Sequence, residues 1–200
     1  MEHKTATTSV PIHPLLASRW SARAIDPAKV VDRDQLGAVL EAARWAPSCG
    51  GDEPWRFMCW DRQRDPAAWR RALDCLEIGN REWVEHAPVL IASFSATQSR
   101  RDKPTRWGPH DVGLATENLL LQATASGLVA HPMAGFDAAA LSAAFAVPEA
   151  FVPQAMIALG QPGELKLLSD KNQTREIAAR VRRPLAENFF EGTWGQGFAP

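Results

Sequence analysis

The first long stretch of alternating apolar and polar positions predicts an amphipathic helix that opens after Asp32 and continues to about Trp45. Its apolar positions recur at helical spacing and form one buried face: Leu36, Val39, Leu40 and Ala43. Asp32 and Gln35 have the spacing of a capping pair. Pro47 stops the helix, because the residue before a proline is restrained from helical geometry.

The longest predicted helix runs from about His110 to Ser126. Apolar residues repeat at helical spacing along it, at Leu114, Leu121 and Ala125. Gly127 stands where a C-terminal glycine cap is expected. A helix this apolar is expected at the centre of the core or at a dimer interface.

The remaining pattern predicts three strands and three shorter helices. The strands are Trp55–Trp60, which is rich in aromatic residues, Pro88–Phe94, which is continuously apolar, and Gln154–Leu159. The helices are Pro14–Ser18, about Pro66–Ile78 and Ala138–Phe145. Helices and strands that alternate in this order predict an α+β fold with one sheet.

The chain as a whole has the size and composition of one domain covering residues 1–200. Of its residues, 46% are hydrophobic and 22% are charged, as in ordinary soluble proteins. The net charge of -1 argues against a general nucleic-acid surface. No apolar run suggests a membrane span, and the N-terminus lacks the apolar centre of a signal peptide, so a cytoplasmic location is expected.

Both chain ends are predicted to be arms. Residues 1–12 suggest a loose N-terminal arm. From Pro184 the chain is rich in proline, glycine and aromatic residues without a period, and residues 186–200 form a C-terminal arm that hangs free or wraps onto a partner subunit. The three cysteines have neither disulfide nor metal-ligand spacing, so no metal site is expected.

Two segments near the N-terminus carry the candidate chemistry. Residues 19–23 read Arg-Trp-Ser-Ala-Arg, and in an extended chain the two guanidinium groups and the hydroxyl lie on one face. Arginine binds phosphate through a bidentate fork. Residues 46–55 read Ala-Pro-Ser-Cys-Gly-Gly-Asp-Glu-Pro-Trp, a loop whose backbone can lie close to a flat ligand.

The order of these segments resembles that of the nitroreductase family: Arg-x-Ser-x-Arg, then a helix, then Ala-Pro-Ser-x-Gly-x-x-x-Pro-Trp. The resemblance implies a small central mixed sheet wrapped by helices. It also implies a homodimer with FMN at the subunit interface, with long helices packed across a two-fold axis and the C-terminal arm extended over the other subunit.

The resemblance also assigns residues to the flavin phosphate and ring. Arg19 and Ser21 match the positions that hold the phosphate, and Arg23 matches the basic residue beside the N1/O2 edge. The stretch before Pro184 resembles a basic element that closes over the phosphate, with Arg182 and Arg183 as equal candidates.

In the loop, Pro47 and Ser48 match the family, whereas Gly51 and Glu53 replace an amide and a glutamine that many members carry. A flavin contact at Gly51 is then made by the backbone. Cys49 lies in the same flavin-facing loop, where its side chain is expected to be a small apolar filler rather than a nucleophile.

Two further segments match the family at the ring. Asn80 matches an asparagine at the pyrimidine edge, although a cap or turn role is an equal reading. Residues 127–136 resemble a loop that packs on the ring. In that loop a backbone N–H of Ala134 or Gly135 points at N5, and Pro132 and Met133 lie along the ring face. His131 is expected to be structural rather than a proton donor.

The resemblance implies ping-pong hydride transfer from NAD(P)H through flavin N5 to a nitroaromatic, a quinone or a similar small oxidant, with no catalytic side chain beyond the flavin. Two alternatives stay open. One is a flavin sensor or carrier without turnover, which the departures at Gly51 and Glu53 favour. The other is a sibling redox enzyme for flavin breakdown or reductive dehalogenation.

The basic segment 97–109 is either a solvated loop or a lid that attracts nicotinamide phosphates.

Overall fold

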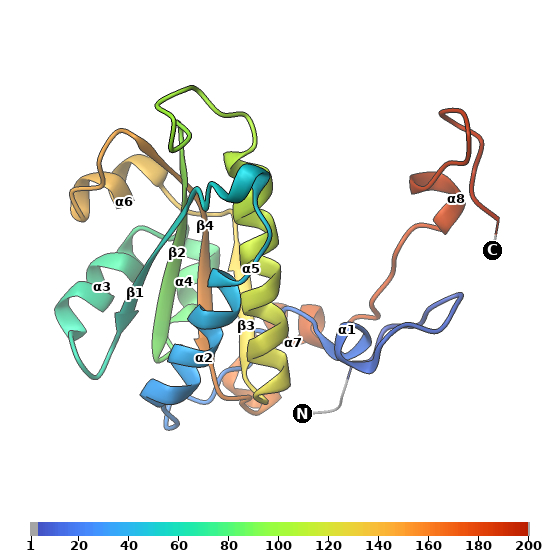
Figure 1. The fold of residues 1–200 in the computed structure, drawn as a ribbon. Helices are drawn as coiled ribbons and strands as arrows, with labels where there is room; N and C mark the ends of the chain where they lie inside the picture. Colours follow the sequence, from blue (N-terminus) through green and yellow to red (C-terminus); the bar gives the residue numbers. More distant parts are fainter. Residues whose placement is uncertain (1–3, 200) are drawn as a thin grey trace.

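Four strands form one sheet in this computed structural model, which describes residues 4–199. Their order across the sheet is β1 (Trp55–Asp61), β2 (Val89–Ala96), β4 (Phe151–Gly160) and β3 (Val129–Met133) (Figure 1). The expected α+β fold is confirmed, but the expectation of a mixed sheet is wrong, because all three pairings are antiparallel. Asp61 pairs with Val89, so β2 starts beside the end of β1 and must run back.

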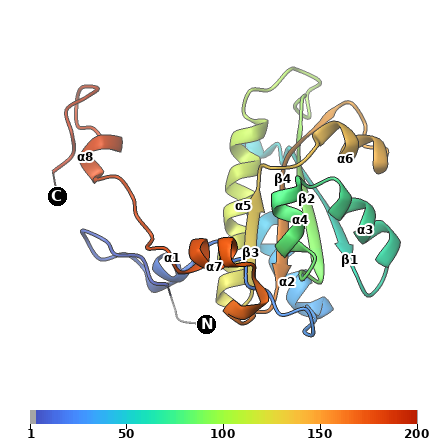
Figure 2. The ribbon, with the colours of Figure 1, turned by 180° about the vertical axis from the view of Figure 1, so that it is seen from behind.

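Helices cover both faces of the sheet (Figures 1 and 2). α2 (Arg33–Arg44) and α5 (Gly108–Ala125) lie on one face, and α3 (Pro66–Asp74), α4 (Ile78–Val84) and α6 (Ala138–Ala144) lie on the other. Successive side chains of β2 enter the two cores in turn, which explains why this strand is continuously apolar.

The predicted helix starts are confirmed to within two residues, but one helix end and one loop assignment need correction. Asp32 and Gln35 form the capping box of α2, and Gly127 has a φ of +72° after α5. The helix expected over residues 66–78 ends at Asp74, because Leu76 leaves it to form a β-bridge with Phe136. Residues 129–133, expected within a loop, form β3, where Pro132 is tolerated because β3 is an edge strand.

The remaining elements are α1 (Pro14–Ser18), the 3₁₀ turns η1 (Cys49–Gly51) and η2 (Leu165–Leu167), α7 (Asp170–Ile177) and α8 (Leu185–Asn188). From Ala178 onward the chain runs away from the sheet (Figures 1 and 2). Of the predicted arms, residues 1–3 and 200 lie outside the described residues. In the N-terminal arm, the backbone N–H of Ala6 donates a hydrogen bond to the carbonyl oxygen of Ala17 in α1.

A membrane-crossing helix would need greater length or apolarity than any helix in residues 4–199 possesses.

Candidate functional site

Residues 19–23 form an extended segment that connects α1 to the bridge between Ile25 and Pro162. Arg19 Nε lies 3.8 Å from Glu117 Oε1 on α5, and Arg23 Nη1 lies 3.9 Å from Glu176 Oε2 on α7. Ser21 is half-buried between them. The segment therefore presents two partly exposed guanidinium groups, with the hydroxyl between them in the chain.

His131 on β3 joins this segment to the sheet. Its Nδ1 lies 3.0 Å from the carbonyl oxygen of Ala22, and its ring lies 4.6 Å from that of Trp83. Burial is the main cause that lowers the pKa of His131 to about 4, and the nearby charges of Arg23 and Arg19 lower it further. The imidazole is therefore neutral at pH 7 and donates its Nδ1 proton to Ala22, which is the structural role expected for it.

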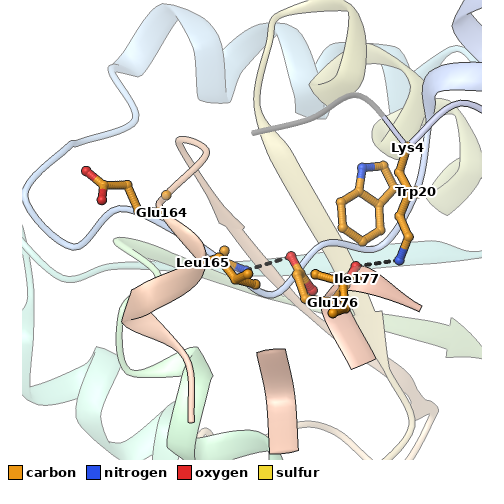
Figure 3. A pocket seen from close by; sticks show the side chains of 8 residues that line it. Lys4, Trp20, Glu164, Leu165, Glu176 and Ile177 are labelled. Atoms are coloured by element: carbon orange, nitrogen blue, oxygen red, sulfur yellow. Dashed lines mark hydrogen bonds between the residues drawn. The ribbon is translucent and has the colours of Figure 1, made fainter. Parts of the chain in front are cut away.

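Glu176 anchors the backbone of the segment from α7. Arg23 N–H donates to both carboxylate oxygens, at 2.9 and 3.0 Å, and Ala24 N–H donates to Oε1 at 3.1 Å. Glu176 is buried and forms part of the wall of a cavity of about 420 Å³, together with Lys4 and Trp20 (Figure 3). Sequence reasoning missed Glu176, because α7 lies outside every recognised motif.

Asn80 and Gly135 lie together in the structure, and Glu77 joins them. Asn80 Nδ2 and the Glu77 backbone N–H both donate to the Gly135 carbonyl, each at 3.0 Å. A Cβ at position 135 would lie 2.7 Å from Asn80 Nδ2 and 2.9 Å from Glu77 Oε2. A larger residue at position 135 would therefore displace the Asn80 amide and the Glu77 carboxylate from their present places.

Pro132 and Met133 point to opposite faces of the sheet, because they are consecutive residues of β3. The Met133 side chain is buried in the core that contains α3 and α4, so only its backbone is available to a ligand. Pro132 is half-buried and Ala134 is exposed.

The C-terminal arginines divide into two groups. Arg182 and Arg183 are exposed just before the C-terminal arm. Arg180, which sequence reasoning did not favour, donates to three carbonyl groups around the first segment: those of Lys4, Ala17 and Arg19. Burial lowers the pKa of Arg180, and the charges of Arg19 and Arg182 lower it further, so like charges gather here.

The second motif packs against the N-terminal part of α5. Cys49 N–H donates to the buried carboxylate of Asp111 at 2.9 Å, and Ser48 Oγ accepts the Glu53 N–H at 3.0 Å. Gly51 and Glu53 have φ values of +67° and +46°. The expectation of Cys49 as an apolar filler is wrong, because the loop holds it by its backbone and leaves its side chain exposed.

Pro47 and Ser48 line a pocket of about 270 Å³ beside α5. Trp107, His110 and Leu114 form much of its opposite wall. The pocket places the second motif next to an aromatic and an apolar side chain, as a flat ligand requires.

Within one chain the two motifs lie at different places along α5 (Figure 1). The loop contacts Asp111, and Arg19 contacts Glu117. These positions are about 9 Å apart along the helix axis. No hydrogen bond or ion pair links residues 47–53 to residues 19–23 in the described part of the chain.

Comparison with known proteins agrees with these motifs. The Nitroreductase family matches residues 16–78 and 62–161. A solved structure described as an oxidoreductase containing FMN is 31% identical, with a TM-score of 0.88 over 98% of this chain and 99% of that one.

Two further relatives carry informative descriptions. A protein of Desulfovibrio desulfuricans solved in complex with FMN is 25% identical, with a TM-score of 0.69 over 92% of this chain and 99% of that one. The NADH dehydrogenase of Thermus thermophilus is 29% identical over 161 residues, which cover 64% of this chain and 76% of the relative. Since the family match spans more than half of the chain, this protein belongs to the nitroreductase family.

Proposed function

We propose that the protein is an FMN-dependent oxidoreductase that uses NAD(P)H to reduce a nitroaromatic, a quinone or a similar small oxidant. The observation that carries this proposal is the convergence of Arg19, Arg23 and Arg180 around one extended segment. The pKa of Arg23 and that of Arg180 are both lowered, chiefly by burial and further by neighbouring arginines, although Glu176 partly offsets this at Arg23, so a bound anion would be favoured here. A phosphate group has the required charge and oxygen geometry.

The residues at the proposed ring site also fit a flavin. The Asn80 amide can donate and accept at a pyrimidine edge. The backbone N–H groups of Ala134 and Gly135 make no hydrogen bond among residues 4–199, so they are available to a ring nitrogen. Bound FMN supplies a ring that accepts a hydride from one substrate and returns it to another.

The chain's own groups would bind and orient the cofactor rather than perform acid or base chemistry. Arg19 and Ser21 would hold the phosphate, with Arg182 or Arg183 closing over it. Arg23 would stabilise negative charge at the N1/O2 edge. Pro132 and the Met133 backbone would lie along the ring. Protons would come from solvent, because neutral His131 is committed to Ala22.

A homodimer would complete this site. The loop with Pro47, Ser48, Cys49 and Gly51 does not meet residues 19–23 within one chain, so a second copy would bring it to the flavin. The C-terminal arm carries two large apolar side chains that are exposed in the single chain, Phe189 and Trp194. Contact with a second copy would remove their apolar surface from water.

The visible spectrum of the purified protein, before and after anaerobic addition of NADH or NADPH, tests the proposal. Flavin bands near a 1:1 ratio that bleach rapidly are expected. Flavin that binds without bleaching would instead support a sensor or carrier, to which the departures at Gly51 and Glu53 point. A colourless protein that takes up no FMN would contradict the proposed site.

Arg19→Ala is expected to weaken FMN binding by about tenfold to hundredfold, because a charge-assisted phosphate contact contributes roughly 1.5–3 kcal/mol. Fluorescence titration of the apoprotein with FMN measures the change. Arg64→Ala is the matched control, since Arg64 is exposed in the turn after β1 and is paired only with Asp61 among the described residues. Equal FMN affinity in both variants would exclude Arg19 from the phosphate site.

Deletion of residues 188–200 is expected to weaken the dimer, because it removes Phe189 and Trp194 from the proposed contact. Sedimentation at decreasing protein concentration, compared with the full chain, measures the dissociation. An unchanged dimer at every concentration would show that the arm contributes nothing to assembly.

A further inference from the structure

A cavity of about 530 Å³ lies between the second motif and the basic segment 97–109. Its walls include Cys49 and Asp52 from one side and residues 99–101 and 104–107 from the other. The volume is within the range of small-molecule sites. The cavity shares Cys49, Trp107 and Asp111 with the smaller pocket at Pro47, so the two lie side by side.

The basic segment is folded back on itself and fastened to the second motif. Gln98 and Pro104 form a β-bridge, and Thr105 N–H donates to the Thr97 carbonyl at 3.1 Å. Arg100 N–H donates to Asp52 Oδ1 at 2.7 Å, and its guanidinium lies 3.0 Å from Glu53. These contacts hold the segment as a wall of the cavity.

The carboxylates in the cavity wall already have partners, whereas some of its guanidinium groups do not. The carboxylates of Asp52 and Asp111 already accept backbone N–H groups, and Arg100 is paired with Glu53. Arg101 and Arg106, by contrast, have no carboxylate within 4.0 Å among residues 4–199. The cavity thus offers two guanidinium groups without a carboxylate partner.

An aromatic side chain stands beside these cations. Trp107 is 42% exposed, and the Arg106 guanidinium lies 4.6 Å from its ring centre. An exposed indole can stack on a purine base, and an arginine next to it can bind a phosphate on the attached sugar. This combination suits a phosphorylated nucleoside, and adenosine is the nucleoside that NADPH carries beside its nicotinamide half.

We infer that this cavity binds the 2′-phosphoadenosine end of NADPH and makes NADPH the preferred reductant over NADH. The inference rests on the proposed function, because the adjoining pocket at Pro47 and Ser48 is the one assigned to the flavin. NADH and NADPH share their pyrophosphate and differ by the 2′-phosphate. Only that group adds a monoester dianion for Arg101 and Arg106 to bind.

The ratio of kcat/KM for NADPH to that for NADH tests the inference in the FMN-loaded protein. The ratio is expected to exceed ten. The double variant Arg101→Ser/Arg106→Ser is expected to lower kcat/KM for NADPH at least tenfold more than that for NADH, mainly through KM. Arg64→Ser is the matched control and is expected to leave the ratio unchanged.

Calorimetric titration with adenosine 2′,5′-bisphosphate and with adenosine 5′-monophosphate provides a readout that needs no turnover. The bisphosphate is expected to bind at least tenfold more tightly, and the double variant to lose this difference while it retains FMN. Equal affinity for the two nucleotides, or a ratio of reductants near one, would overturn the inference. Absence of bleaching by either reductant would contradict the proposed function alone, since the titration still decides the nucleotide site.

Discussion

Glu176→Ala is expected to lower the free energy of unfolding by about 3 kcal/mol, because it leaves two backbone donors without an acceptor, at roughly 1–3 kcal/mol for each buried one. The donors belong to Arg23 and Ala24, and Ala24 is only 1% exposed. The variant also releases the segment that presents Arg19 and Arg23, so FMN affinity is expected to fall with stability. Urea denaturation of the apoprotein measures the first effect, and FMN titration measures the second.

Two further variants separate the hydrogen bonds from general effects of substitution. Glu176→Gln keeps one side-chain oxygen, and in the native protein Oε1 alone accepts from both backbone groups, so a smaller loss is expected. Glu164→Ala changes an exposed glutamate in the wall of the same cavity, and its effect is expected to be small (Figure 3). A Glu176→Ala protein as stable as the Glu164→Ala protein would contradict the role of the buried carboxylate.

The stability of the apoprotein is expected to fall by up to about 3 kcal/mol between pH 7 and pH 4 because of His131 alone. Its folded-state pKa is lowered from 6.5 to about 4. Below pH 6.5 the imidazole of His131 becomes protonated in the unfolded chain, whereas in the folded protein it becomes protonated only near pH 4. The stability that the neutral imidazole allows is therefore fully present above pH 6.5, and it is lost as the pH falls from 6.5 to about 4.

Urea denaturation at pH 7, 5.5 and 4.5 measures this dependence. Carboxylates titrate in the lower part of the same range, so the slope is compared with that of His131→Gln, which retains a side-chain donor for the Ala22 carbonyl but has no ionisable ring. The variant is expected to lose less stability over this range. Parallel curves for the two proteins would show that His131 is not buried in its neutral form.

Local chemistry made much of the fold predictable. The capping box at Asp32 and Gln35, the glycine after α5 and the apolar period of both long helices are properties of neighbouring residues. β3 was not predicted, because it is short and contains Pro132. A proline is tolerated in an edge strand, and the strand order that makes β3 an edge strand is a property of the tertiary structure. The direction of each strand likewise depends on where the connecting helices return the chain.

The sequence by itself determined the family, the α+β fold and the two arginine and loop motifs, because these depend on residue types at short spacing. Only the tertiary structure decided which distant groups support them. Glu176 and Arg180 lie more than 150 residues after the segment that they hold. The Glu176 carboxylate binds the backbone of Arg23 and Ala24, and the Arg180 guanidinium binds the carbonyl of Arg19 together with those of Lys4 and Ala17. The separation of the two motifs along α5, and the cavity that Arg101 and Arg106 share with the second motif, likewise arise from packing that no short spacing encodes.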